Sequence, residues 1–163
     1  MSVQETLRRL PGMHCFGCAS SDGNPHGLNL LFTPGADGKS ASTEFVLPRK
    51  FQSYPGIAHG GIVGAVLDEA MGYVGVFGRG LLPFTRRFEV NLRASVRVEV
   101  KLRCVAHWVR DLDDGYSARA ALKTEGGATL ATSQGDFLFP TRELAERLLP
   151  SAPPEGYETF FRN

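Results

Sequence analysis

The sequence predicts an α+β protein in which an antiparallel sheet of five or six strands wraps around one long central helix. The segment 60–77 is almost wholly apolar and is long enough for a buried helix. From Val90 to Leu102, apolar residues occupy the even positions and polar residues the odd ones, which is typical of a half-buried strand. Because the helix is apolar on nearly every side, we expect the sheet to enclose it.

Length and composition indicate an ordinary soluble protein with one core. The chain has 163 residues, of which 42% are apolar and 21% charged. We expect one domain over 1–140, whose first 27 residues form a short helix and a loop, and then a small helix and tail over 141–163. A net charge of +1 favours neither nucleic acid nor an anionic membrane as a partner. The three cysteines and the polar N-terminus predict reduced thiols and a cytoplasmic location.

Before the long helix, short elements are separated by turn-forming residues. Residues 2–5 have the spacing of a capping box, which predicts a helix over 3–9. Strands are expected at 28–33 and 40–47, joined by the turn at 34–38.

After the long helix, the sequence predicts mainly strands. The alternating segment is too long for one ordinary strand, so we expect a break near 94–97. Asp114-Gly115 is a hairpin signal, and it predicts strands at 116–124 and 129–139. A small closing helix is expected over 143–149.

The long helix also carries the first candidate for chemistry. Asp68 and Glu69 are the only charged side chains between Gly60 and Gly78, and a buried carboxylate is unfavourable unless it is paired or used. The first amides of a helix lack intrahelical partners and suit a developing oxyanion. Asp68 lies about 12 Å along the helix axis from Gly60, beyond the reach of its side chain. If both groups serve one reaction, they come from two antiparallel copies of the helix.

The predicted helix contains five glycines, at 60, 61, 64, 72 and 75, and each costs roughly 0.5–1 kcal/mol relative to alanine. Close approach of the sheet, or of a ligand to the exposed amides, would explain them. Together with the adjacent acids, the glycines favour a buried core helix over a membrane-spanning one.

Three sets of residues resemble a known family. The first is His59-Gly60-Gly61 followed by Asp68-Glu69 and preceded by Tyr54-Pro55-Gly56. The second is Cys15-Phe16-Gly17-Cys18 with Asn24-Pro25-His26-Gly27-Leu28, and the third is Thr85 with Phe88-Glu89-Val90-Asn91-Leu92. Over residues 15–139, the chain resembles the PaaI-like branch of the hotdog-fold acyl-CoA thioesterases.

The resemblance implies a hotdog fold, a homodimer or a tetramer built from dimers, and hydrolysis of acyl-CoA without a metal or organic cofactor. It implies that Asp68 is the nucleophile or general base, that the Gly60 amide of the partner subunit polarises the thioester carbonyl, and that His59 and Thr85 assist. Relatives often carry Asn or Gln in the loop before the His-Gly-Gly motif, where Gln52 and Ser53 stand here. The expected substrate-contacting residues are Gly61, Gln52, Ser53, Tyr54, Glu69, Phe84 and Arg93.

Other interpretations stay open. The protein could bind acyl-CoA without catalysis, as a sensor or carrier. Asp68 could be a buried acid paired with an arginine. Glu69 could form a structural pair with another residue, and His59 could be a hydrogen-bonded structural residue. Cys15-x-x-Cys18 suggests zinc or redox chemistry, but the remaining cysteine and the histidines complete no recognisable ligand set. We therefore expect small buried thiols in a packed loop.

Overall fold

The computed structural model describes residues 2–10, 12–20, 22–149 and 155–163. These residues form one six-stranded antiparallel sheet with the strand order β1-β2-β4-β5-β6-β3. The strands are β1 (Thr33–Pro34), β2 (Ser40–Val46), β3 (Phe84–Leu92), β4 (Lys101–Leu112), β5 (Gly115–Thr124) and β6 (Thr129–Leu138). The predicted α+β architecture is confirmed.

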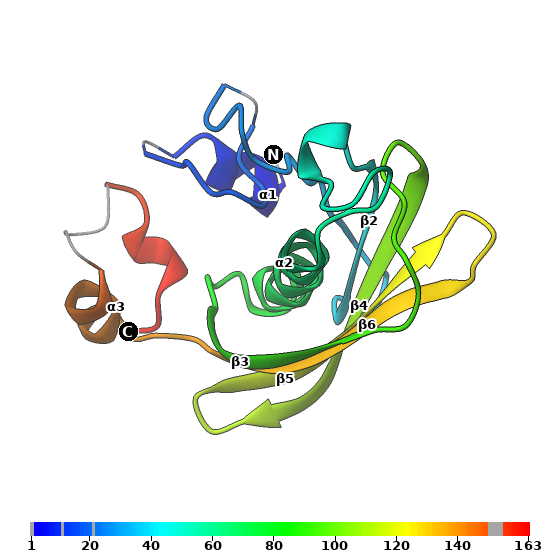
Figure 1. The fold of residues 1–163 in the computed structure, drawn as a ribbon. Helices are drawn as coiled ribbons and strands as arrows, with labels where there is room; N and C mark the ends of the chain where they lie inside the picture. Colours follow the sequence, from blue (N-terminus) through cyan, green and yellow to red (C-terminus); the bar gives the residue numbers. More distant parts are fainter. Residues whose placement is uncertain (1, 11, 21, 150–154) are drawn as a thin grey trace.

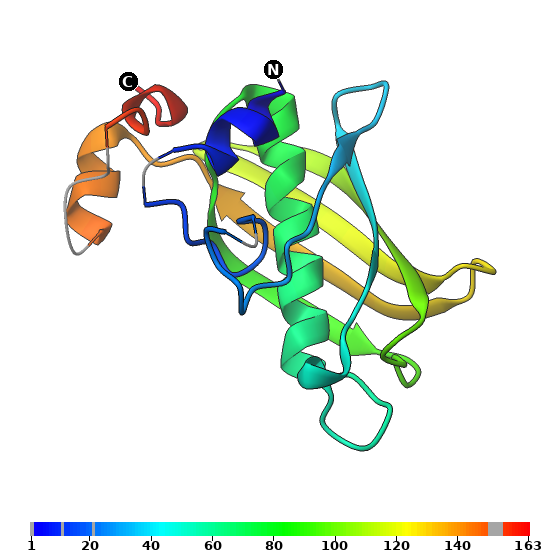
Figure 2. The same cartoon turned by 90° about the horizontal axis from the view of Figure 1, so that it is seen from above.

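The long helix α2 (Gly60–Arg79) lies in the concave side of the curved sheet, as Figures 1 and 2 show. It ends at Gly80, whose left-handed φ of 68° a glycine adopts without strain. Val66, Ala70 and Val74 are fully buried. Although α2 is long and apolar enough to cross a membrane, half of its most apolar window is buried inside the protein, as expected for a core helix.

The N-terminal segment covers α2 on the side away from the sheet (Figure 1). Its helix α1 (Val3–Arg8) begins with the predicted capping box, formed by Ser2 and Glu5. The buried side chain of Gln4 donates to the carbonyl of Leu30 at 3.2 Å and accepts from the amide of Phe32 at 2.9 Å. These two hydrogen bonds hold α1 against the segment that leads into the sheet.

The strand predicted at 28–33 is wrong for most of its length. Only β1 pairs there, over Thr33–Pro34. The Leu28 amide donates to the Phe16 carbonyl at 2.7 Å, and the Leu30 amide donates to the Gly17 carbonyl at 2.9 Å. Because these backbone groups bond the N-terminal loop, they are not available to a neighbouring strand. The strand predicted at 40–47 is confirmed as β2.

The predicted break in the alternating segment is also confirmed, although it is longer than expected. β3 ends at Leu92 and β4 begins only at Lys101. Within this connection, Val96 and Val98 are buried, and the Val96 carbonyl accepts from the Ala58 amide at 2.8 Å. The alternation therefore marks Val96 and Val98 correctly as buried, but Leu92 and Val100 are exposed. Part of this connection instead holds the loop before α2.

The C-terminal elements follow the prediction closely. Leu112 pairs with Gly115 across the hairpin turn between β4 and β5. After β6 come α3 (Arg142–Leu148) and a short 3₁₀ turn, η2 (Glu158–Phe160). The Leu82 amide donates to the Phe160 carbonyl at 2.9 Å, so the C-terminal segment packs on the chain that leaves α2. The tail around 150–154 lies outside the described residues.

Candidate active site

The start of α2 presents one amide for which the described residues contain no acceptor. The His59 ring caps the helix, since its Nδ1 accepts from the Gly61 amide at 3.0 Å. His59 therefore makes the kind of hydrogen bond expected of a structural residue, with the Gly61 amide as donor. Among the described residues, no hydrogen bond engages the Gly60 amide. That amide is left at the positive end of the helix.

The loop before α2 is shaped by its own polar groups. Gln52 Oε1 accepts from the Gly56 amide at 3.1 Å, and the Ser53 amide donates to the Ile57 carbonyl at 2.8 Å. The side chain of Tyr54 is 77% exposed. Within one chain these three residues lie beside the helix start and do not line the cavity that contains Asp68.

One face of α2 follows the edge strand β3 in the opposite direction. Residues four apart lie on one face of a helix. As the helix proceeds from Gly60, each such residue lies beside a position nearer the start of β3, and the last lies beside Pro83, just before the strand. The neighbouring pairs are Gly60 with Leu92, Gly64 with Val90, Asp68 with Thr85 and Gly72 with Pro83. A Cβ at Gly60 would lie 3.1 Å from Leu92 Cδ1, so glycine permits this close approach.

Asp68 lies in the middle of this face. Its Oδ1 accepts a hydrogen bond from the Thr85 hydroxyl at 2.9 Å. Burial raises the pKa of the half-buried Asp68 carboxyl, and the Thr85 hydroxyl partly opposes that shift. No ion pair among the described residues includes Asp68, so the pairing with an arginine is absent from this part of the chain.

A cavity of about 250 Å³ adjoins Asp68. It is mostly apolar, and its lining consists of Leu7, Met13, Cys15, Cys18, Asp68, Glu69, Gly72, Tyr73, Val76, Leu82, Pro83 and Thr85. Phe84, one of the expected substrate-contacting residues, does not line this cavity, because its ring packs edge-on against Phe161 at a centroid distance of 6.5 Å. The contributions of Leu7 and Met13 were missed, because no pattern in the sequence places the N-terminal segment over this cavity.

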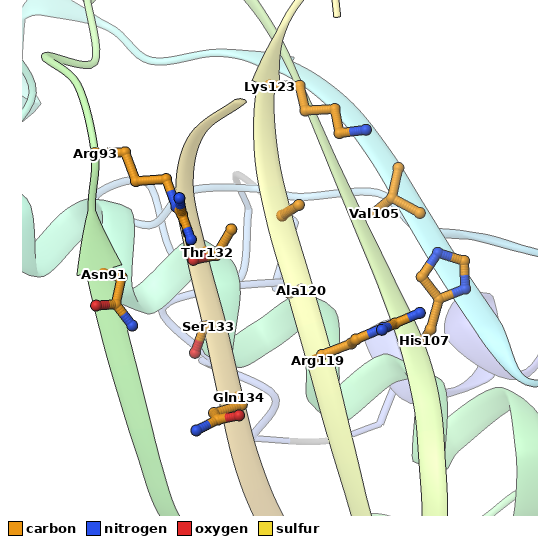
Figure 3. Close-up of a pocket in the computed structure, with 11 residues that line it drawn as sticks. Asn91, Arg93, Val105, His107, Arg119, Ala120, Lys123, Thr132, Ser133 and Gln134 are labelled. Atoms are coloured by element: carbon orange, nitrogen blue, oxygen red, sulfur yellow. Dashed lines mark hydrogen bonds between the residues drawn. The ribbon is translucent and has the colours of Figure 1, made fainter. Parts of the chain in front are cut away.

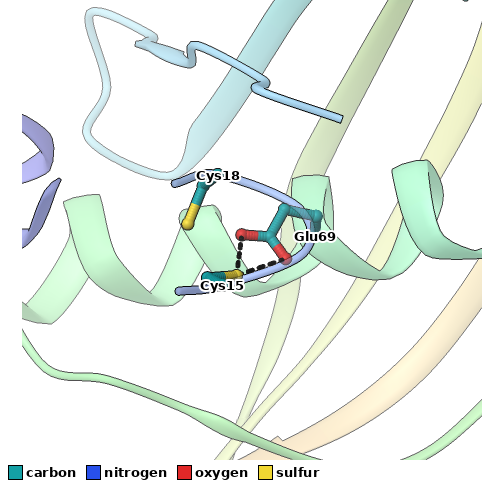
Figure 4. A group of neighbouring side chains, drawn as sticks. All are labelled: Cys15, Cys18 and Glu69. Carbon is teal, nitrogen blue, oxygen red and sulfur yellow. Dashed lines mark hydrogen bonds between the residues drawn. The ribbon is translucent and has the colours of Figure 1, made fainter. Parts of the chain in front are cut away.

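Glu69 points to the N-terminal loop and meets both nearby cysteines (Figure 4). Cys15 Sγ lies 3.7 and 3.9 Å from the two carboxyl oxygens. Burial raises the pKa of Glu69 to about 8. A hydrogen bond from the Cys18 thiol lowers the pKa of Cys15 to about 5. The expected structural pairing of Glu69 is therefore present, with a partner that sequence spacing does not reveal.

Arg93 lies at a different surface. It lines a groove of about 450 Å³ on the face of the sheet opposite α2 (Figure 3). Its Nε donates to Thr132 Oγ1 at 3.4 Å. The other basic side chains of this groove are His107, Arg119 and Lys123. This surface carries positive charge suited to phosphate, but it is on the far side of the sheet from Asp68 of the same chain.

Comparison with known proteins identifies the fold. No family model and no curated protein matches the chain. A thioesterase superfamily protein of known structure has a TM-score of 0.66 and 19% identity to this chain. The match covers 71% of this chain and 59% of that protein. The PaaI protein of the phenylacetic acid degradation operon of E. coli has a TM-score of 0.62 and 14% identity, covering 68% of this chain and 83% of its own.

A third structure, a Streptococcus mutans protein bound to acetyl-CoA, has a TM-score of 0.61 and 18% identity. Its match covers 68% of this chain and 87% of that protein. The chain therefore has the hotdog fold of PaaI-type thioesterases.

Proposed function

We propose that this protein is a cytoplasmic homodimeric hydrolase that cleaves acyl-CoA thioesters to a free acid and CoA. One observation carries the proposal: the Gly60 amide and the Asp68–Thr85 pair occupy opposite parts of one α2 face, along the edge strand of the sheet. The fold shared with thioesterases, and the acetyl-CoA bound to the Streptococcus mutans structure, support this class of substrate.

The edge strand β3 gives the dimer a simple geometry. β3 is the last strand in the sheet order, and its Phe88 and Leu92 side chains are 42% and 57% exposed. Antiparallel pairing of two β3 strands about a two-fold axis near Phe88 would place Thr85 opposite Asn91 of the partner subunit. Asp68 lies beside Thr85 and Gly60 lies beside Leu92, so each Asp68 would approach Gly60 of the partner subunit.

In this arrangement, the thioester carbonyl oxygen accepts from the partner's Gly60 amide, which stabilises the oxyanion of the tetrahedral intermediate. As general base, Asp68 takes a proton from water while the water oxygen bonds to the carbonyl carbon. The carbon–sulfur bond then breaks and the CoA thiolate takes up the proton. As nucleophile, Asp68 would instead attack the carbonyl carbon and expel the CoA thiolate, which forms an anhydride that water hydrolyses to the free acid and the Asp68 carboxylate. In both routes the Thr85 hydroxyl orients the carboxylate.

The rest of the substrate has two candidate surfaces. The mostly apolar cavity beside Asp68 suits the acyl group. The phosphates of CoA require cations, and Arg93 with its basic neighbours is the candidate for that contact. Gly61, Ser53 and Tyr54 lie near the proposed carbonyl position at the start of α2. No step of this mechanism uses a metal or organic cofactor.

Subunit complementation tests the shared site. Asp68→Asn and Gly60→Pro remove the acid and the amide from different chains, and each homodimer should be inactive against a panel of acyl-CoAs. When the two variants are unfolded and refolded together, about half of the dimers should contain one chain of each variant. Each mixed dimer has one intact site of its two, so about a quarter of wild-type activity should return. No recovery, with heterodimers shown by mass spectrometry, would contradict a site shared between subunits.

The same assay separates catalysis from binding alone. Release of CoA thiol is followed with DTNB, and binding of acyl-CoA is followed by calorimetry. Wild-type protein that binds acyl-CoA esters and releases no thiol from any of them would favour a non-catalytic sensor or carrier.

A further inference from the structure

Three side chains of the kinds that bind metals gather at one end of the cavity lining, and no step of the proposed hydrolysis uses them. One ligand atom from each of Cys15, Cys18 and Glu69 lies within 4.8 Å of the others (Figure 4). In a tetrahedral zinc site, with Zn–S of about 2.3 Å and Zn–O of about 2.0–2.2 Å, ligand atoms are separated by somewhat less than this. A small contraction would therefore bring all three atoms to bonding distance of one ion.

The charge of the cluster is not balanced by a basic side chain. No ion pair among the described residues includes Glu69. The ionisable groups that act on its carboxyl are Cys15, Cys18 and Asp68, which are acids. A buried carboxylate without a cation is unfavourable, and a divalent ion at this point would stabilise the ionised form.

The loop is shaped around the Glu69 carboxyl. A side chain at Gly17 would overlap that carboxyl, so the loop lies directly against the end of the Glu69 side chain. The deprotonated thiol is the form that binds metals, and both thiols of the cluster lie beside the same carboxyl.

A buried hydroxyl beside the cluster also lacks a partner. Tyr73 is 3% exposed and lines the same cavity. Its hydroxyl has no hydrogen-bond partner among the described residues. A water bound as fourth ligand of a metal ion at the cluster would give this hydroxyl an acceptor or donor.

We propose that Cys15, Cys18 and Glu69 bind one zinc-class ion, with a water from the cavity as the fourth ligand. The ligands come from the N-terminal loop and from α2, which are 54 residues apart in the chain. The ion thus ties the segment that covers the cavity to the central helix. Its role is structural, and the acid and amide proposed for hydrolysis lie on another face of α2.

Titration of the reduced protein with Co²⁺ tests this site without any substrate. We expect one ion per chain, with the intense visible bands of a tetrahedral site and near-ultraviolet thiolate-to-cobalt charge transfer. Zn²⁺ should displace the Co²⁺ and raise the melting temperature. Because no activity is measured, failure of the proposed hydrolysis would leave this result unaffected.

Three variants locate the ligands. Cys15→Ser and Cys18→Ser should each diminish the charge-transfer band and weaken binding at least about tenfold, while Glu69→Gln should keep the band and weaken binding by about tenfold. Cys104→Ala is the matched control, since Cys104 is fully buried in β4, and its spectrum should equal that of the wild type. Circular dichroism checks that each variant folds.

Two results would overturn the proposal. One is a reduced wild-type protein, with all three thiols counted by DTNB after unfolding, that develops no charge-transfer band with Co²⁺. The other is an unchanged band in folded Cys18→Ser protein. A chain that forms a Cys15–Cys18 disulfide in air and binds no Co²⁺ after reduction would also overturn the proposal.

Discussion

Asp68 and Glu69 are neighbours on α2, yet they face different parts of the molecule. Successive residues of a helix point about 100° apart. Asp68 therefore meets the Thr85 hydroxyl along the edge strand β3, while Glu69 meets Cys15 under the N-terminal loop. Burial raises the pKa of both carboxyls. Asp68 and Glu69 differ in the side chains that they contact. One apolar helix can therefore carry the proposed hydrolytic acid on one face and the proposed metal ligand on the neighbouring face.

Exchanging each acid for its amide gives the sharpest test of this division. Asp68→Asn should lower kcat by about a hundredfold to ten-thousandfold, because it removes the proposed base or nucleophile. It should leave Co²⁺ binding intact. Glu69→Gln should keep kcat within about tenfold of wild type and weaken Co²⁺ binding. Steady-state kinetics and the cobalt spectrum of both proteins measure this, and equal losses of activity would break the comparison.

The Asp68 face has a second functional position at the helix start. Gly60→Pro should lower kcat by about a hundredfold or more, because it removes the amide proposed to stabilise the oxyanion. Proline is compatible with the first turn of a helix, so the fold should persist. Gly60→Ala keeps the amide and meets only the flexible end of Leu92. Similar kinetics for the two variants would exclude the amide from the mechanism.

Thr85 should have a smaller effect, since it acts through Asp68. Thr85→Val removes the 2.9 Å hydrogen bond to Oδ1 and should lower kcat by about tenfold. KM should change little, because the lost contact is to the carboxylate and not to substrate. Thr85→Ser, which keeps the hydroxyl, should restore kcat. A loss in KM alone would assign Thr85 to substrate binding.

Asp136, at the sheet surface, provides a reference acid with the opposite pKa shift. Hydrogen bonds from Ser117 at 2.6 Å and Arg87 at 2.7 Å lower the pKa of Asp136 below its ordinary value of 3.8. Its ionised form therefore stabilises the folded protein above that value, and the contribution is lost as the pH falls through the lowered pKa.

Asp136→Asn should lower the melting temperature at pH 7 by no more than about 3 °C, since Arg87 is largely exposed. The difference from wild type should shrink below about pH 4. A difference that grows on acidification would contradict the sign of this shift.

The fold was predictable because its signals are local and periodic. The apolar segment 60–77 and the even-odd alternation from Val90 predict a core helix and strands, and the structure confirms α2 and the break between β3 and β4. The strand at 28–33 failed for a non-local reason. Its amides bond carbonyls of Phe16 and Gly17, and propensity contains no information about such partners.

The candidate site divides in the same way. Spacing along α2 was enough to separate Gly60 from Asp68 and to require two copies of the helix for joint action, because helical rise is constant. The residues opposite each position could not be predicted in the same manner. That Thr85 meets Asp68, and that Cys15 and Cys18 close over Glu69, depends on how β3 and the N-terminal loop pack on the helix.

Helix periodicity, burial and the positions of the acids thus follow from the order of the residues, since each depends on neighbours a few positions away. The covering of the cavity by the N-terminal segment, the free edge of β3 and the gathering of two thiols and a carboxyl do not. They arise from contacts between segments far apart in the chain, such as the 54 residues between Cys15 and Glu69. Packing of the whole core selects those contacts, and no local pattern encodes them.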